Sequence, residues 1–253
     1  MNEPILKIVK LRKAFGGVLA VNDLDLSVAR GTVASIIGPN GAGKTTMFDL
    51  ITGYVKPTGG QIIYGDKSIN GEKTHVIAGL GIARTFQNVR IFPDMTVLEN
   101  VMVGCHLRSK AGLFLSLLIP PFFRKEENAI RDAAKKWLAF VGLEKKSDEA
   151  AGTLPLGSQR ILEVARSLAM EPQLLLLDEP ASGLNTRETM AMGELIVKIK
   201  EMGTTVVLVE HDMELVMDIS DAVTVINFGS RIAHGTPVDV QENPDVITAY
   251  LGE

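Results

Sequence analysis

Apolar and polar positions alternate near the start of the chain. Between residues 23 and 28, Leu24, Leu26 and Val28 are apolar and their neighbours are polar. A period of two is typical of a strand with one buried and one solvated face. Residues 5–30 are therefore predicted to form antiparallel β structure.

Further along, short continuous apolar runs alternate with segments of helical period. A continuous apolar run is typical of a strand buried on both faces of a parallel sheet. Strands are predicted over residues 33–37, 59–66, 82–86, 173–179, 204–209 and 222–227, and helices over residues 45–52, 158–170, 187–202 and 212–219. This alternation predicts an α/β core with a mainly parallel sheet and helices on both sides, beside the antiparallel β subdomain.

In the middle of the chain the pattern becomes helical. Thr96 and Glu99 have the spacing of a capping box, which marks the start of a helix. In a second helix apolar residues recur on one face, and a glycine ends it. These residues are Ile130, Ala134, Trp137, Leu138, Val141 and Gly142. We predict a helical lobe over about residues 88–157, inserted into a core of about residues 1–87 and 158–253.

Composition narrows the class of protein. The chain has 253 residues, of which 46% are apolar, so it can bury a large core. A formal net charge of -4 argues against nucleic acid as a partner. Cys105 is the single cysteine, which excludes a disulfide within the chain, and we expect it to be a buried apolar residue.

The longest apolar run, residues 113–123, is too short to span a bilayer, which needs about 20 residues, and two prolines interrupt it. The first ten residues mix charged and apolar side chains, unlike a secretory signal. A soluble protein is therefore expected.

Residues 38–46 fit the phosphate-binding pattern G-x-x-x-x-G-K-[ST] at every fixed position. They are Gly38, Pro39, Asn40, Gly41, Ala42, Gly43, Lys44, Thr45 and Thr46. The glycines let backbone N–H groups turn inward around an anion, Lys44 can reach the β- and γ-phosphates, and the Thr45 hydroxyl can bind Mg²⁺. A strand precedes the loop and a helix follows it, which favours a phosphate site over an ordinary glycine-rich turn.

Three polar side chains follow predicted strands. Asp178 and Glu179 end the strand at residues 173–179, and His211 comes after the strand at residues 204–209. Parallel strands carry ligand sites at their carboxyl ends, so we expect these residues to lie near the phosphate loop. Asp178 can hold Mg²⁺ directly or through water, and Glu179 can orient or deprotonate an attacking water. His211 can hydrogen-bond the γ-phosphate, and the alternative is a structural histidine.

Two further candidates have weaker local support. Gln87 follows the strand predicted at residues 82–86, and its amide can reach the metal or the water. Phe15 precedes a pair of glycines and can stack on a flat base. From the local sequence alone, Phe15 fits an ordinary core phenylalanine better.

Together these motifs resemble those of an ATP-binding subunit of an ABC transporter, and the resemblance covers essentially the whole chain. Residues 38–46 match the Walker A loop, and residues 174–179 match the Walker B strand followed by the catalytic glutamate. The resemblance implies a P-loop NTPase fold over residues 1–253, forming a single ABC-type domain that binds ATP and Mg²⁺ and hydrolyses ATP.

The resemblance also implies roles for single residues. Phe15 would stack on adenine, Gln87 would be the Q-loop residue near the metal and the water, and His211 would be the switch histidine. Residues 181–185 occupy the place of the D-loop, with Asn185 where the family usually has aspartate.

The family's diagnostic signature, L-S-G-G-Q, is altered in this chain. Its place is taken by Leu154, Pro155, Leu156, Gly157, Ser158 and Gln159. Pro155 replaces the serine whose hydroxyl would contact the γ-phosphate, although the loop can still aim a helix N-terminus at phosphate. In this family two subunits enclose two ATP molecules head to tail, each Walker A loop facing the partner's signature. We therefore expect a heterodimer with two unequal sites.

A closer resemblance is to the ATPase subunits of branched-chain (hydrophobic) amino-acid importers. It is carried by residues 84–87, the insert at 112–124, the altered signature, residues 181–185, residues 210–217 and the tail at 243–252. It implies three kinds of partner: a second ATPase subunit, two integral-membrane permease subunits and an extracytoplasmic solute-binding protein. The chain would then be peripheral, on the cytoplasmic face of the cell membrane. The apolar stretch at 113–123 either lies near the permease or folds back on the helical lobe.

The alternatives are a soluble ABC-type ATPase acting as a scaffold or clamp, an ABC importer of another small solute, and a P-loop GTPase or kinase. The acidic balance and the lack of long coiled-coil insertions argue against a clamp on DNA. No N/T-K-x-D sequence, which would read guanine, is present. We therefore favour the importer motor.

Overall fold

The chain consists of two units, each described by itself. Met1–Arg84 and Gln173–Glu253 form the first unit, and Thr85–Pro172 form the second. The computed structural model describes residues 3–106 and 120–251, with side chains for residues 3–106 and 127–250. The predicted placement of the apolar stretch at 113–123 therefore lies outside the described side chains.

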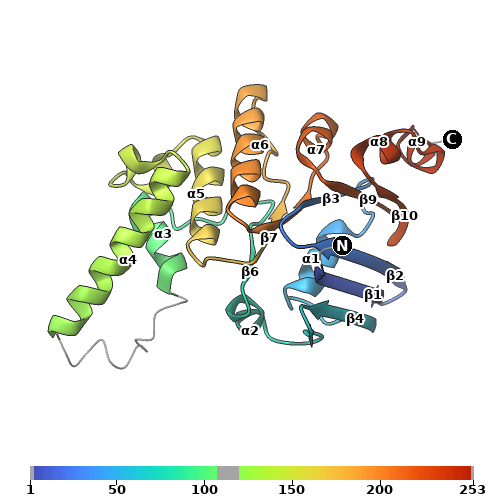
Figure 1. Ribbon diagram of the computed structural model, residues 1–253, viewed down its shortest axis with the longest axis horizontal. Helices are drawn as coiled ribbons and strands as arrows, with labels where there is room; N and C mark the ends of the chain where they lie inside the picture. Colours follow the sequence, from blue (N-terminus) through green and yellow to red (C-terminus); the bar gives the residue numbers. More distant parts are fainter. Residues whose placement is uncertain (1–2, 107–119, 252–253) are drawn as a thin grey trace. The chain divides into compact units, whose positions relative to one another are not determined.

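The first unit contains a four-stranded antiparallel sheet in the order β2-β1-β4-β5 (Figure 1). Its strands are β1 Pro4–Phe15, β2 Val18–Ala29, β4 Gly59–Tyr64 and β5 Lys67–Ser68. Leu24, Leu26 and Val28 are all buried, and Leu26 pairs with Ile8 across the first two strands. The alternation of apolar and polar residues therefore predicted the buried face correctly.

A six-stranded sheet in the order β10-β9-β3-β8-β7-β6 carries the rest of the first unit. Its strands are β3 Val33–Ile37, β6 Ile82–Arg84, β7 Leu174–Asp178, β8 Thr205–Val209, β9 Ala222–Asn227 and β10 Ser230–Gly235. All neighbours pair in parallel except β10, which pairs antiparallel with β9. Every residue of β3, β7 and β8 is buried, which explains why their sequences are mainly apolar. The mainly parallel sheet is confirmed.

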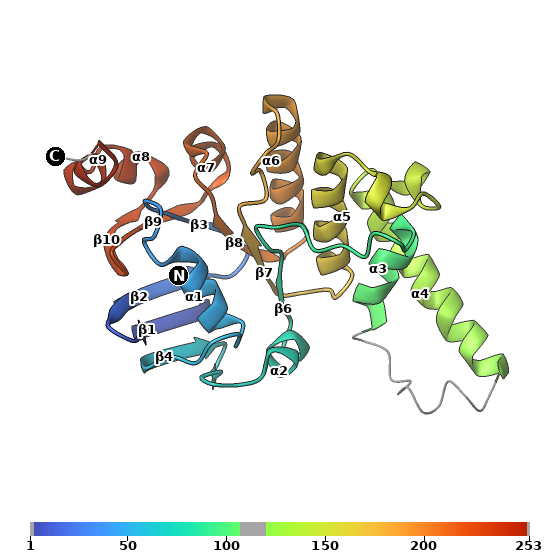
Figure 2. The same ribbon diagram turned by 180° about the vertical axis from the view of Figure 1, so that it is seen from behind.

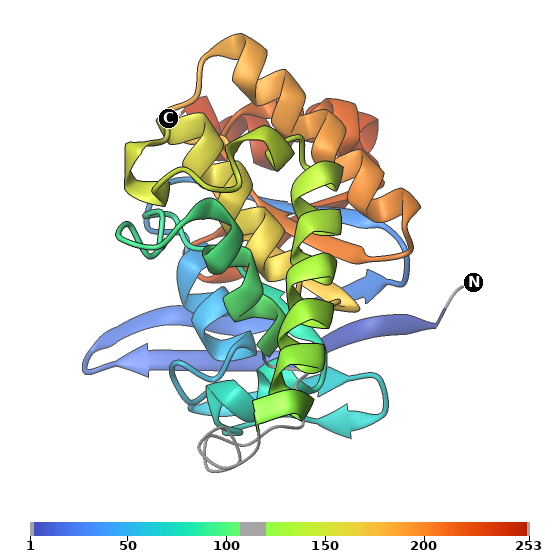
Figure 3. The same ribbon diagram turned by 90° about the vertical axis from the view of Figure 1, so that its left-hand side faces the viewer.

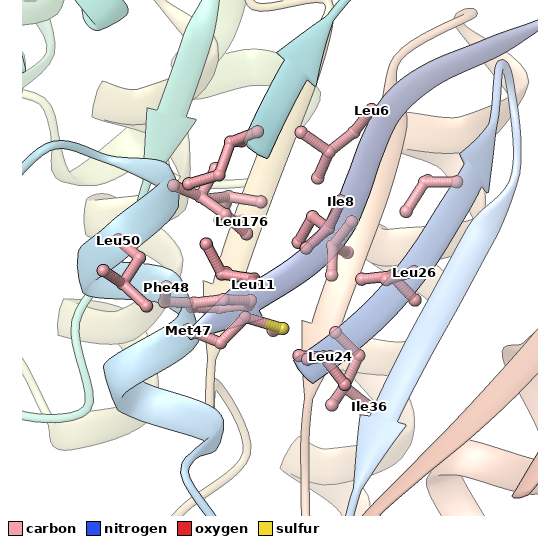
Figure 4. Packing of buried hydrophobic residues seen from close by; sticks show 14 of the residues in the cluster. Leu6, Ile8, Leu11, Leu24, Leu26, Ile36, Met47, Phe48, Leu50 and Leu176 are labelled. Carbon is pink, nitrogen blue, oxygen red and sulfur yellow. The ribbon is translucent and has the colours of Figure 1, made fainter. Parts of the chain in front are cut away.

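Helix α1, Lys44–Ile51, packs between the two sheets (Figure 4). Met47 and Phe48 of this helix share one core with Leu11 of β1 and Leu176 of β7, and all four are fully buried. Helices α6 (Thr186–Glu201) and α7 (Met213–Ile219) cover the opposite face of the parallel sheet (Figures 1 and 2). Because α1 is fixed by both sheets, the loop before it has a rigid support.

Several short elements were not predicted. They are β5, β10, α2 (Thr74–Gly79), α8 (Pro237–Gln241) and α9 (Pro244–Leu251). None of them was assigned from the hydropathy pattern. Helix α8 is instead marked by its capping box, in which Thr236 and Asp239 bond each other's backbone amides.

The second unit is helical (Figure 3). Its helices are α3 Val97–His106, α4 Pro120–Phe140 and α5 Leu156–Leu168, with 3-10 turns at Glu144–Lys146 and Ala151–Thr153. The capping box before α3 is confirmed, since the Thr96 amide donates to Glu99 at 2.8 Å and the Glu99 amide donates to Thr96 at 3.1 Å. Cys105 is buried in the core of this unit, as predicted.

The boundary between core and lobe differs from the prediction. From the hydropathy pattern, the core was predicted to resume at residue 158. In the structure, the first unit resumes at Gln173. Helix α5 therefore belongs to the helical unit. Its Leu162 and Ala165 are buried against Val101 of α3 in one cluster, a long-range contact that local periodicity does not reveal.

Among the described residues, no helix is both long enough and apolar enough to cross a membrane.

Candidate functional site

The phosphate-binding loop joins β3 to α1, and two of its glycines are required by close approach of other backbone. A Cβ atom on Gly38 would lie 2.0 Å from the carbonyl oxygen of Ile226, and one on Gly43 would lie 2.3 Å from that of Ala20. Gly43 also has a positive φ of 100°. Any larger residue at either position would push β9 or β2 away from the loop.

Lys44 folds back over the loop. Its ammonium donates hydrogen bonds to the carbonyl oxygens of Gly38 at 2.6 Å and Pro39 at 3.0 Å, and the residue is only 7% exposed. Burial lowers the pKa of Lys44, while the nearby carboxylates of Glu179 and Asp178 raise it. Strand β8 pairs with both β3 and β7, so the strand that leads into the loop and the strand that ends at Asp178 lie in neighbouring positions of the same sheet.

The N-terminus of α1 is open to an anion. In the described part of the chain, no side chain caps the first turn, which begins at Gly43. Uncapped N–H groups and the helix dipole favour a negatively charged ligand at this end. Thr45, in the first turn, is exposed, so its hydroxyl is available to a ligand or a metal.

The protein oxygens near the loop suit Mg²⁺. Asp178 ends β7 as a buried carboxylate, and burial raises its pKa while Arg84 lowers it. No cluster of three or more histidine, cysteine or acidic side chains that could hold a metal is found among the described residues. Mg²⁺ is usually held by one or two protein oxygens together with substrate phosphates and water, which matches Thr45 and Asp178.

Glu179 has an unusual backbone. Its φ is +49°, a left-handed conformation that costs a non-glycine residue about 1–3 kcal/mol, and its amide donates to the carbonyl oxygen of Val209 at 2.8 Å. Its carboxylate Oε2 lies 3.7 Å from Nδ1 of His211, whose side chain is 62% exposed. The turn thus places Glu179 next to a histidine that is open to solvent.

Glu210 is a residue of this edge whose role was missed. It is 1% exposed, and its two carboxylate oxygens accept hydrogen bonds from the backbone amides of Ala181 at 2.7 Å and His211 at 3.1 Å. Burial raises its pKa, and these hydrogen bonds oppose the shift. One carboxylate therefore ties the segment after Glu179 to His211. The signal in the sequence was an acidic residue directly after the apolar run at residues 206–209.

Phe15 ends β1 and is 47% exposed, so the alternative of a core phenylalanine is wrong. The ammonium of Lys13 lies 4.7 Å from the centre of its ring. An exposed ring face beside a cation can stack on a planar base.

Gln87 and the signature residues belong to the second unit. β6 ends at Arg84, two residues before the predicted strand end at Phe86, and Gln87 lies exposed after it. Residues Leu156 to Gln159 form the first turn of α5 rather than a loop, with Pro155 as the N-cap. The Gln159 side chain donates to the Leu154 carbonyl at 2.9 Å.

The asparagine at position 185, where the family usually has aspartate, is explained by its place at the start of a helix. It is the N-cap of α6, and it forms a capping box with Glu188 in which both hydrogen bonds are 3.1 Å long. An asparagine caps a helix as well as the aspartate expected from the family.

The C-terminal helix α9 also faces the phosphate loop. A groove of about 620 Å³ separates them, lined by Asn40 and Gly41 on one side and by Asp245 and Thr248 on the other. Phe228, at the turn between β9 and β10, lines it too.

Comparison with known families gives two matches. The family described as "ABC transporter" matches residues 21–182, and the family described as "Branched-chain amino acid ATP-binding cassette transporter" matches residues 230–253. The first match contains the phosphate loop, Asp178 and Glu179, and the second contains α8 and α9.

Individual proteins resemble the chain over its full length. It is 47% identical to the high-affinity branched-chain amino acid transport ATP-binding protein LivG of Escherichia coli K12, and 48% identical to BraF, which bears the same description, of Pseudomonas aeruginosa PAO1. Both alignments cover 100% of each chain. The crystal structure of the ADP conformation of an ATP-binding cassette of an ABC transporter matches with a TM-score of 0.86 and 31% identity, again over 100% of both chains.

Proposed function

This chain belongs to the ABC transporter family of ATP-binding proteins, and we propose from that premise that it is the ATP-hydrolysing motor subunit of an importer for branched-chain amino acids. ATP hydrolysis is the activity of the family. The phosphate loop is needed by every member, so it does not indicate which solute is transported. The observation that supports branched-chain amino acids as the substrate is the match of residues 230–253 to the family described as "Branched-chain amino acid ATP-binding cassette transporter".

ATP would bind with its phosphates against the loop and the open end of α1. Lys44 would exchange its hydrogen bonds to the Gly38 and Pro39 carbonyls for the β- and γ-phosphate oxygens. Phe15 would stack on the adenine ring. We assign the loop residues from Gly38 to Thr46 to this binding site.

Hydrolysis would depend on the residues after β7 and β8. Glu179 would orient the attacking water and accept its proton, and the exposed His211 would bond the γ-phosphate. Thr45 and Asp178 would hold Mg²⁺, and the bound ion would neutralise charge on the phosphates. Glu210 would hold His211 and the segment after Glu179 in fixed positions, through its hydrogen bonds to the amides of Ala181 and His211.

We propose that the chain pairs with a second ATPase subunit, that the pair docks on two permease subunits at the cytoplasmic face of the membrane, and that a solute-binding protein delivers substrate outside. The altered signature supports unequal sites, since Pro155 at the N-cap of α5 offers no hydroxyl. The test is Pro155→Ser, which restores the hydroxyl. A fully active homodimer of the chain, with an ATPase rate that Pro155→Ser leaves unchanged, would contradict the heterodimer.

The importer role is tested by purifying the tagged Glu179→Gln chain from detergent-solubilised membranes with Mg-ATP. This substitution keeps the nucleotide site but removes the base, so it should hold the ATP-bound complex. Lys44→Ala, which weakens ATP binding, serves as the matched control. We expect two permease subunits and a second ATPase to be recovered with Glu179→Gln and in lower yield with Lys44→Ala.

Binding of labelled leucine by a solute-binding protein recovered with the complex would support the branched-chain substrate. Binding of an unrelated solute would instead favour an importer of that solute. Recovery of soluble partners alone, under conditions in which a known membrane complex survives, would contradict the importer and favour a scaffold ATPase.

A further inference from the structure

A buried arginine joins two of the elements that build the hydrolysis site. Arg84 is the last residue of β6, the strand next to β7. Its Nη2 donates to Oδ2 of Asp178 at 2.9 Å, and its Nη1 donates to Oδ1 of Asp49 at 2.6 Å and to the Thr52 hydroxyl at 3.3 Å. Asp178 ends β7, and Asp49 and Thr52 lie on α1 and at its C-cap.

The guanidinium is held from several sides. The Arg84 side chain is 5% exposed and that of Asp178 is 2% exposed, so water screens this ion pair weakly. The guanidinium carbon also lies 5.4 Å from the centre of the Phe48 ring. Since Phe48 is itself fully buried in the core, the guanidinium has little freedom to turn away from the two carboxylates.

The carboxylates of Asp178 and Asp49 both affect the oxygen atoms that we assign to Mg²⁺ binding. Asp178 is the proposed metal carboxylate, and Arg84 bonds one of its two oxygens, which sets the orientation of the other. Asp49 lies four residues after Thr45 on α1, one helical turn along the same face. A bond to Asp49 therefore fixes the helix turn that presents the Thr45 hydroxyl.

We propose that Arg84 is a positioning residue for ATP hydrolysis, which holds the Asp178 carboxylate and the Thr45 turn of α1 at a fixed separation for the metal. The proposal rests on the proposed Mg²⁺ site. It gives Arg84 no contact with ATP, so the effect must appear in the metal dependence rather than in nucleotide binding itself.

Arginine is the residue that this bridge requires. Two of its nitrogens point to two different carboxylates in the fixed fork of a planar group. A lysine would keep the charge but would offer one ammonium on a flexible stem, so it could not hold both carboxylates in the same geometry.

The experiment compares Arg84→Lys, Arg84→Met and Asp49→Asn with the unchanged protein. Binding of a fluorescent ATP analogue is measured in EDTA and over a series of Mg²⁺ concentrations, and steady-state ATPase rates are measured over the same series. Arg12→Met is the matched control. Arg12, on β1, forms an equally short ion pair with Asp23 at 2.6 Å, but its side chain is 50% exposed.

We expect Arg84→Met to raise the half-saturating Mg²⁺ concentration by about tenfold or more, the usual effect of removing a residue that orients a metal ligand. Arg84→Lys and Asp49→Asn should raise it by about threefold, between the unchanged protein and Arg84→Met. Binding in EDTA should change by less than about twofold in all variants, and Arg12→Met should match the unchanged protein throughout.

The outcomes separate the two proposals. If the unchanged protein binds and hydrolyses ATP equally well in EDTA, the proposed Mg²⁺ site fails. If the unchanged protein needs Mg²⁺ but Arg84→Met and Arg84→Lys keep its half-saturating concentration, the role of Arg84 is overturned. Should Arg84→Met not fold, Arg84→Lys and Asp49→Asn decide the question, since both keep a polar group in place.

Discussion

The ammonium of Lys44 donates a 2.6 Å hydrogen bond to the carbonyl oxygen of Gly38, at the opposite end of the loop that the two residues define. Lys44 thus joins the two ends of its own loop. Burial lowers the pKa of Lys44, because it disfavours the charged ammonium. A bound phosphate would stabilise that ammonium.

Lys44→Met should therefore affect ligand binding more than folding. The variant removes a poorly solvated charge and keeps most of the side-chain volume. A ligand present at about 100 times its dissociation constant stabilises a protein by about 2.7 kcal/mol. We expect this ATP-dependent rise in thermal midpoint to be nearly absent in Lys44→Met, and a rise of unchanged size would contradict the assignment.

Glu179→Gln should separate binding from hydrolysis. The glutamine can keep the same left-handed backbone but cannot accept a proton from water. We expect the ATPase rate to fall by about 10²–10⁴-fold, the range attributed to general-base catalysis. The affinity for ATP, measured by fluorescence titration, should be retained. A loss of less than about tenfold in rate would remove Glu179 from the role of base.

Phe15→Ala tests the stacking site. Stacking of a base on an aromatic ring is worth about 1–3 kcal/mol when the ring is replaced by alanine, so we expect ATP affinity to drop by about 5- to 160-fold. Phe15→Trp should retain the affinity because its ring is also planar. Equal affinity in Phe15→Ala and the unchanged protein would show that the exposed ring has another use.

Glu210→Gln should destabilise the segments that follow β7 and β8. Both carboxylate oxygens accept backbone amides, and the NH₂ group of a glutamine would face one of those donors. We expect a loss of about 1–3 kcal/mol in the free energy of unfolding and a reduced ATPase rate. Glu188→Gln is the control, because Glu188 accepts one amide at a helix start, where glutamine serves equally well.

Two glutamates of the helical unit should give opposite pH dependences. Burial raises the pKa of Glu163 above its ordinary 4.5, so the folded protein binds this proton more tightly than the unfolded chain. Its contribution is complete below pH 4.5 and is lost as the pH rises through the raised value. Relative to the unchanged protein, Glu163→Gln should therefore gain stability as the pH rises from acid to neutral.

Glu99 has the opposite shift. The Thr96 backbone amide lowers its pKa below 4.5, so its contribution is present above that value and is lost as the pH falls through the folded pKa. Relative to the unchanged protein, Glu99→Gln should lose stability as the pH rises. Urea unfolding from acid to neutral pH measures both trends. Parallel slopes for the two variants would show that the burial of Glu163 does not govern its titration.

Several parts of this protein follow from the sequence alone, because the interactions that produce them are local. The glycine spacing from Gly38 to Gly43 already identifies the phosphate loop. Thr96 and Glu99 meet within one helical turn, and the apolar runs at β7 and β8 reveal strands buried on both faces. The family resemblance followed from the same local motifs.

Only the tertiary structure decided which distant residues share a contact. Arg84 meets Asp49, 35 residues before it, and Asp178, 94 residues after it, and Glu210 meets Ala181 across 29 residues. The spacing of these residues along the chain does not predict their contacts, because the contacts form only when elements distant in the sequence are packed together. Burial then strengthens each pair, since low dielectric favours a matched charge and penalises an unmatched one. The residues of the site can be read from the chain, whereas the contacts that hold them in place exist only in the fold.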